Sequence, residues 1–149
     1  MIIYTIGFTK KSAEEFFEKI SQNNIEVLID TRLNNQSQLA GFSKGRDLPY
    51  FLKKISNCNY SYQKDYAPTK DILDVYKKGK IDWKEYEEKY LMLIRERNVV
   101  KHFSNNFSEY SNILLLCSEH TAECCHRRLL AEEISKDLGV SVELNYSNQ

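Results

Sequence analysis

The residue types with the most chemical potential lie between Cys117 and Arg127, in the stretch CSEHTAECCHR. Cys117 follows an apolar run, and Cys125 lies about one turn into the helix expected after Thr121. A helix N-terminus and neighbouring cations both favour the thiolate, which is the nucleophilic form of cysteine. Either Cys117 or Cys125 could therefore act as a nucleophile. The alternative is simple burial, because cysteine is among the most often buried residue types.

Two residues of the same stretch could move protons. His126 is a candidate acid, base or electrostatic partner for a thiolate, because histidine changes its charge near neutral pH. Glu119 could serve as a base or could orient an arginine. Its alternative is a purely structural pair with Arg127. His120 is a weaker candidate in the same loop.

Arginines supply the candidate anion contacts. Arg32 lies beside Asp30 at the end of an apolar run, and Arg127 follows the cysteines. The planar guanidinium binds carboxylate or phosphate through two N–H groups, and a helix N-terminus adds to such a site. We therefore expect an anionic small molecule or a nucleic acid as the partner. The alternative for Arg127 is a solvated helix face or a pair with Glu132 or Glu133.

A zinc site is the chemical rival for the same stretch. It would draw on soft ligands, namely Cys117, His120, Cys124, Cys125 and His126. Zinc sites use such ligands, but the spacing lacks a repeated C-x2-C pair. Consecutive helix residues also point about 100° apart, which hinders ligation by both Cys125 and His126. Our first expectation is a site without metal or cofactor, and a zinc-stabilised domain is the alternative.

Apolar runs and amphipathic stripes alternate along the chain. Short apolar or alternating runs predict strands over residues 2–6, 26–30, 59–62, 112–116 and 140–144. Capping residues followed by apolar residues at helical spacing predict helices after Ser12, Asp47, Thr69, Asp82 and Thr121. The expected inward faces of two of these helices include Ile55 and Leu138. The run 112–116 is the most apolar, which predicts the central strand.

This alternation predicts a three-layer α/β fold in a single domain over residues 1–149. It would hold a mostly parallel sheet of four or five strands with helices on both faces. Ligands of such sheets bind beyond the carboxyl ends of the strands, where the strand order reverses. The residues that follow or end the strands should share this edge and contribute to binding or catalysis, and they are Gly7, Thr9, Asp30, Arg32 and Cys117.

The bulk composition narrows the class of protein. The chain has 149 residues, of which 42% are hydrophobic and 28% charged, as in one globular domain. Its formal net charge of zero argues against a strongly electrostatic nucleic-acid binder, but not against a local basic patch. No apolar run reaches the roughly 20 residues of a membrane span, and the first residues lack signal-peptide features. We therefore expect a cytoplasmic protein without a membrane partner, and for its four cysteines we favour free thiols, a metal site or a catalytic role over a disulfide framework.

Three motifs resemble the domain-of-unknown-function family DUF488. The opening YTIGF is similar to the family's Y-T-I-G-H-like start, with Phe8 at the histidine position. Asp30-Thr31-Arg32 resembles the family's D-V-R element, so the acid and the arginine are kept. The stretch LLLCSEHTAECCHRRLLAE resembles its late L-L-C-x-E…C-H-R segment. The resemblance covers nearly the whole chain and implies an α/β fold with a site at this edge.

The candidate site admits three functional hypotheses. The first is a thiol-dependent enzyme acting on a phosphate-bearing substrate, a nucleotide or nucleic acid. Its anion contacts, thiols and proton carriers would be Arg32 and Arg127, Cys117 or Cys125, and His126 or Glu119. The second is a non-catalytic module that binds nucleic acid or another ligand, in which Arg32→Ala would be harmful and Cys→Ser harmless. The third is the zinc-stabilised domain.

Overall fold

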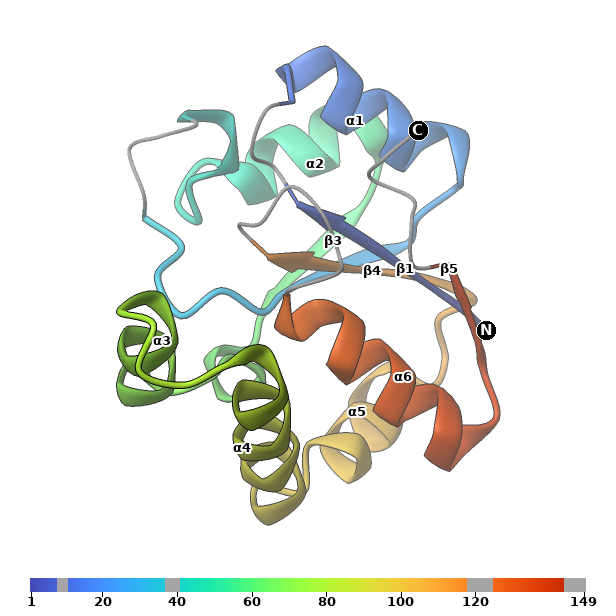
Figure 1. The fold of residues 1–149 in the computed structure, drawn as a ribbon. Helices are drawn as coiled ribbons and strands as arrows, with labels where there is room; N and C mark the ends of the chain where they lie inside the picture. The colour runs from blue at the N-terminus through green and yellow to red at the C-terminus, as the bar shows by residue number, and fades with distance from the viewer. Residues whose placement is uncertain (8–10, 37–40, 118–124, 144–149) are drawn as a thin grey trace.

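A five-stranded, all-parallel sheet forms the centre of the fold (Figure 1). The computed structural model describes residues 1–7, 11–36, 41–117 and 125–143. The strands lie in the order β3-β2-β4-β1-β5. Their bounds are β1 Ile2–Gly7, β2 Val27–Asp30, β3 Asn59–Tyr62, β4 Asn112–Cys117 and β5 Ser141–Glu143. The predicted α/β class with a parallel sheet in a single domain is confirmed.

Helices cover both faces of this sheet (Figure 1). One face carries α1 Ala13–Gln22 and α2 Leu48–Ser56, and the other carries α4 Trp83–Glu96, α5 Val99–Phe107 and α6 His126–Leu138. The short helix α3, Lys70–Lys77, packs beside α4, and two 3-10 turns occupy Gly41–Ser43 and Lys64–Tyr66. Within the described ranges, no helix has the length and apolar character needed to cross a membrane.

Strand β4 shows why the sheet needs two helical layers. Its side chains alternate between the faces: Ile113 and Leu115 pack in the core under α4, α5 and α6, and Leu114 and Leu116 pack under α1 and α2. All four are fully buried. A strand that is apolar on both faces is stable only when both faces are covered, which is the arrangement of parallel sheets.

Three predicted helix starts are satisfied by side-chain caps. Ser12, Thr69 and Asp82 each accept a hydrogen bond from the backbone N–H three residues on, at 3.1, 3.3 and 2.9 Å. Such a bond satisfies one of the N–H groups that the first helical turn leaves without an intrahelical partner. The caps therefore set where α1, α3 and α4 begin.

The start of α6 differs from the prediction. Thr121 lies outside the described residues, and α6 begins at His126 with Cys125 as its N-cap. The backbone of Cys125 is extended, with φ −139° and ψ 140°, so the prediction that Cys125 lies one turn inside the helix is wrong. The extended backbone lets its sulfur meet the sulfur of Cys117, a tertiary contact that local capping signals do not encode. The 100° argument against shared ligation therefore does not apply to this pair.

Two side chains that were expected to face the core are exposed. Ile55 is 54% exposed and Leu138 is 39% exposed. Ile55 lines a surface groove with Phe17 and Phe51, and Leu138 lines another beside Val99. Helical spacing predicts which side of a helix faces inward, but not how far along the helix the covering surface extends.

The strand order reverses between β2 and β4. From β2 the chain passes through α2 to β3 at one edge, and from β4 it passes through α6 toward the opposite edge. These two connections lie on opposite faces of the sheet (Figure 1). A crevice therefore opens beyond the carboxyl ends of β2 and β4, which is where ligands bind in sheets of this kind.

Candidate functional site

The ends of three neighbouring strands carry the predicted site residues. Gly7 at the end of β1 pairs in register with Cys117 at the end of β4. Asp30 at the end of β2 pairs with Leu116, and the backbone N–H of Thr31 donates to the Leu116 carbonyl at 3.0 Å. The structure thus places Gly7, Asp30 and Cys117 at one edge of the sheet.

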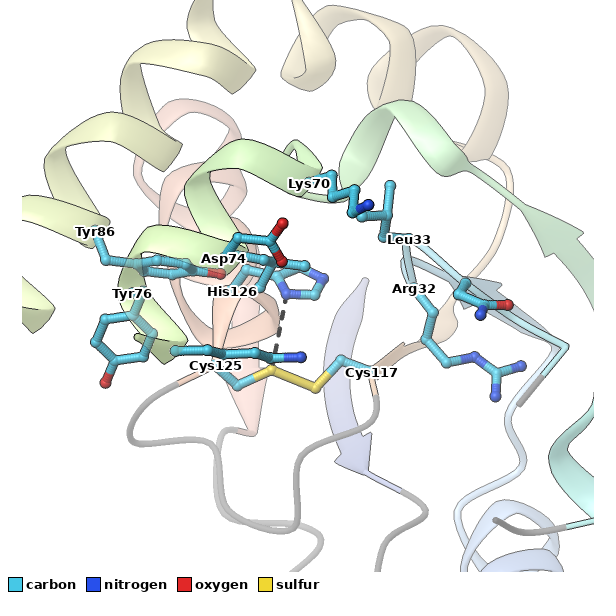
Figure 2. Close-up of a pocket in the computed structure, with 12 residues that line it drawn as sticks. Arg32, Leu33, Lys70, Asp74, Tyr76, Tyr86, Cys117, Cys125 and His126 are labelled. Carbon is cyan, nitrogen blue, oxygen red and sulfur yellow. Dashed lines mark hydrogen bonds between the residues drawn. A yellow bond between two sulfur atoms is a disulfide. The ribbon is translucent and has the colours of Figure 1, made fainter. Parts of the chain in front are cut away.

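Cys117 and Cys125 meet through their sulfur atoms, which are joined as a disulfide (Figure 2). Cys117 ends β4 and Cys125 caps α6, and both side chains are buried. Their Cα atoms lie 7.5 Å apart, beyond the roughly 4.4–6.8 Å usual for bridged cysteines. This backbone spacing is wide for a bridge and suits two separate thiols. Cys117 and Cys125 can therefore exist as two thiols or as a disulfide.

Arg127 contacts the cysteine pair. It lies in the first turn of α6, is fully buried, and donates from Nη1 to the Sγ of Cys117 at 2.8 Å. A buried guanidinium at hydrogen-bond distance stabilises negative charge on sulfur, because little water screens it. Of the alternatives considered for Arg127, a solvated helix face is therefore wrong.

His126 is held in one orientation beside Cys125. Its Nε2 lies 2.8 Å from the Thr31 carbonyl oxygen, which can only accept, so Nε2 carries the proton of the neutral ring. The other nitrogen, Nδ1, is then an acceptor and lies 4.0 Å from Cys125 Sγ (Figure 2). Burial above all lowers the pKa of His126 to about 4, with Arg127 adding to this and Thr31 opposing it. The imidazole is therefore neutral at pH 7.

Asp30 and Arg32 form a buried ion pair. Arg32 donates from Nε to Oδ1 at 2.8 Å and from Nη2 to Oδ2 at 2.7 Å. Tyr60 also donates to Asp30 at 2.6 Å, and Arg32 reaches the Ser43 carbonyl at 2.6 Å. The guanidinium therefore ties the 3-10 turn Gly41–Ser43 to the end of β2. In Figure 2 it points away from the cysteine pair.

A pocket of about 570 Å³ opens where the strand order reverses (Figure 2). Cys117, Cys125 and His126 line one part of it, and residues 32–34 line another. The rest comes from α3 and from Tyr86 of α4. The pocket thus joins the late cysteine segment to the segment after β2, but the Arg32 guanidinium points away from the cysteines, so the composite site stays a prediction.

The α3 wall of this pocket was missed by sequence reasoning. It contributes Lys70, Leu73, Asp74, Tyr76 and Lys77. Lys70, Leu73, Asp74 and Lys77 follow the spacing i, i+3, i+4, i+7, so they share one face of the helix. None of the α3 side chains is buried. Two lysines on one face of this helix are the sequence signal that could have pointed to a binding face.

Lys11 is a second cation near Arg127 that was also missed. Its Nζ atom is buried and has no hydrogen-bond partner among the residues that the structure describes. Burial lowers the pKa of Lys11 to about 8, and the charge of Arg127 contributes in the same direction. Its position shortly after β1, in the sequence Lys10-Lys11, was the available signal.

Several predicted residues lie outside the described part of the chain. These are Thr9, Glu119, His120 and Cys124. Across residues 1–7, 11–36, 41–117 and 125–143, no cluster of three or more His, Cys, Asp or Glu side chains could hold a metal ion. The zinc hypothesis also depends on His120 and Cys124, so it stays a prediction that metal analysis of the purified protein would test.

The fold and the site define a class: a doubly wound α/β protein with a cysteine-lined pocket at the carboxyl edge of its sheet. The family called Domain of unknown function DUF488 matches residues 12–134, and the chain belongs to this family. No curated protein and no solved structure matches the chain. Family membership thus agrees with the resemblance seen in the sequence motifs.

Proposed function

We propose that this chain is a thiol-dependent enzyme that acts on a phosphate-bearing substrate, a nucleotide or nucleic acid. Cys125 is the nucleophile and Cys117 is its neighbour. One observation carries the proposal: both sulfurs meet at a pocket, with the Arg127 guanidinium 2.8 Å from Cys117 Sγ. Pockets that hold convergent polar groups and reactive side chains are the usual place for chemistry.

The surroundings of Cys125 favour its thiolate when the pair is reduced. Cys125 is the N-cap residue of α6, so its side chain lies near the positive end of the helix dipole, although no backbone N–H of α6 donates a hydrogen bond to its sulfur. Arg127 adds a buried positive charge beside the pair. These effects lower the pKa of a thiol, and the thiolate is the reactive form.

His126 supports the thiol as a hydrogen-bond acceptor rather than as a strong base. Its Nδ1 faces Cys125 Sγ at 4.0 Å, and its pKa of about 4 makes the ring a weak base. Activation of Cys125 therefore rests mainly on α6 and Arg127. His126 positions the thiol and links it through Thr31 to the end of β2.

We assign the phosphate contact to the α3 lysines. Lys70 and Lys77 are exposed, line the pocket and lie on one face of α3. The charge of Arg32 already pairs with Asp30, so Arg32 shapes the pocket wall instead of holding the anion directly. A phosphate held between α3 and the start of α6 would lie next to Cys125, because all three line the same pocket.

Peptide-resolved alkylation of the reduced protein against pH tests the thiol half of this proposal. We expect Cys125 to react with an apparent pKa clearly below the ordinary ~8.5. Cys58 is a matched reference in the same chain, because burial raises its pKa to about 12. If Cys117 and Cys125 both titrate as ordinary thiols, the nucleophile assignment is wrong.

A binding module without chemistry is the second candidate, and the burial of both sulfurs favours it. Cys117 is 0% exposed and Cys125 is 2% exposed, which limits the approach of a large substrate. This candidate predicts that Cys125→Ser leaves ligand affinity unchanged and that the protein turns over no substrate.

We also propose a cytoplasmic location, where the reducing environment would favour the dithiol.

A further inference from the structure

We infer that Cys117 and Cys125 are a dithiol–disulfide pair that exchanges electrons with low-molecular-weight thiols and disulfides through the pocket. The structure joins the two sulfurs as a disulfide, and both residues line the pocket. The exchange goes beyond the proposed function. Its effect on catalysis, described below, rests on that function.

The location of the pair argues for exchange rather than for a structural cross-link. The two cysteines are only 8 positions apart in sequence, so the bridge closes a short loop and constrains the unfolded chain less than a bridge across a long loop would. The pair also lies at a pocket, at the junction of β4 and α6, and not inside one of the two apolar cores. Cys58 provides the contrast, because it is a single buried thiol packed in the core under α1 and α2.

The two cysteines have different surroundings, which assigns their roles. Cys125 is the N-cap of α6, so the positive end of the helix dipole favours its thiolate, and its sulfur is the attacking atom. Cys117 is fully buried and accepts a hydrogen bond from Arg127. Cys117 is therefore the resolving sulfur, and Arg127 stabilises it as a thiolate whenever the bridge opens.

Oxidation of the pair then proceeds in two displacements. The Cys125 thiolate attacks one sulfur of a disulfide RSSR, which forms a Cys125–SR mixed disulfide and releases RS⁻. The Cys117 thiolate next attacks Cys125 Sγ, which forms the Cys117–Cys125 bond and releases a second RS⁻. Two electrons pass from the cysteine pair to RSSR, and the two protons of the original thiols end on the released RS⁻ groups.

Reduction is the same path in reverse. An external thiolate attacks Cys125 Sγ, and the S–S electron pair leaves with Cys117 as a thiolate beside Arg127 Nη1. A second thiolate releases Cys125 and forms RSSR. A leaving group of low pKa departs faster, so the guanidinium promotes opening of the bridge.

The exchange controls the proposed enzyme activity. In the disulfide form neither Cys117 nor Cys125 is a thiolate, so the nucleophile is absent. In the dithiol form Cys125 is available next to the α3 lysines. The low-molecular-weight thiol–disulfide ratio would therefore set the active fraction of the protein.

A trapping experiment on the full chain tests the assignment. The reduced protein is incubated with oxidised glutathione, quenched in acid, alkylated and mapped by peptide mass spectrometry. The wild-type chain should lose two thiols, with the bridge between Cys117 and Cys125. The Cys117→Ser chain should accumulate a glutathione mixed disulfide on Cys125, whereas the Cys125→Ser chain should leave Cys117 unmodified.

Matched variants separate this pair from the other thiols. Cys58→Ser and Cys124→Ser should form the same bridge at the wild-type rate. Arg127→Met should slow reduction of the bridge by dithiothreitol by about tenfold, and Arg127→Lys should restore part of the rate. The trapping result does not depend on whether the Arg127 variants fold.

Several outcomes would overturn the inference. They are a bridge that maps to Cys124, a Cys117→Ser chain that traps no glutathione on Cys125, or a bridge that excess dithiothreitol cannot open. The proposed function fails separately, if the bridge forms as described but no phosphate ligand protects Cys125 from alkylation. Conversely, a low thiol pKa at Cys125 without bridge formation would defeat the exchange and leave the proposed function intact.

Discussion

At the scale of single residues, the site is a set of buried groups whose charges are set by their neighbours. His126 is kept neutral, Asp30 and Arg32 neutralise each other, and Arg127 faces sulfur. Each of these residues was a candidate on sequence grounds, but only the structure assigns them different tasks. Two of the tasks can be measured without knowing the substrate.

The first residue-scale prediction concerns the titration of His126. Its folded pKa of about 4 lies below the ordinary 6.5, so the unfolded chain binds more protons between these values. The free energy of unfolding should therefore fall as pH drops from about 6.5 to about 4, by up to about 3 kcal/mol. NMR titration of the imidazole and urea denaturation against pH measure the two effects.

His126→Gln is the control for this pH dependence, because it removes the titrating group. The variant should lose this part of the slope between pH 4 and 6.5. A native His126 resonance that titrates near 6.5 would show that the ring is not held neutral by burial.

The second residue-scale prediction concerns the buried Asp30–Arg32 pair. Asp30→Asn leaves the Arg32 guanidinium buried without its countercharge, and we expect a loss of about 3 kcal/mol or more in the free energy of unfolding. Asp47→Asn removes the exposed partner of Arg46 and should cost less than about 1 kcal/mol. Equal losses in urea denaturation would show that the Asp30–Arg32 pair does not support the end of β2.

At the scale of elements, α3 is the wall that the sequence did not reveal. Its lysine stripe is visible in the sequence, but its position against the cysteines depends on how α3 packs beside α4. Tyr76 of α3 and Tyr86 of α4 have ring centroids 4.9 Å apart, and both line the pocket. The apolar pattern of each helix shows which of its own residues share a face, but it does not show which residues of two helices meet.

The lysine stripe leads to an element-scale prediction. Replacing both Lys70 and Lys77 by Ala should weaken pyrophosphate binding by about tenfold, because two charge-assisted contacts are lost. Lys78→Ala is the matched control, since Lys78 is exposed at the end of the same helix but does not line the pocket. Isothermal titration calorimetry measures both, and equal effects would mean that α3 only contributes general positive charge.

Most strands could be predicted from the sequence, because short apolar runs bounded by turn residues are typical of buried strands. The run 112–116 indeed forms the central β4, and its end places Cys117 at the site. The start of α6 could not be predicted, because its N-cap is Cys125, and cysteine is not a residue type that marks a helix start. The paired state of Arg32 was equally hidden, since it involves Ser43 from a segment without a periodic pattern.

At the scale of the whole molecule, the topology explains why the site exists. The reversal of strand order between β2 and β4 leaves a crevice, and chain segments far apart in sequence meet there. The rule that ligands bind at such reversals predicted the location of the pocket from the alternation of strands and helices. The rule does not specify the chemistry, which we propose comes from Cys117, Cys125 and the α3 lysines.

The central claim is that a phosphate-bearing ligand and the reactive thiol share this pocket. Its most direct test is alkylation of reduced protein with and without a mixture of ribonucleoside triphosphates or a single-stranded oligonucleotide. We predict that at least one of these ligands slows labelling of Cys125 and leaves labelling of Cys58 unchanged, because Cys58 lies in the core under α1 and α2. Labelling of Cys125 at the same rate with every ligand, or equal slowing at Cys58, would contradict the claim.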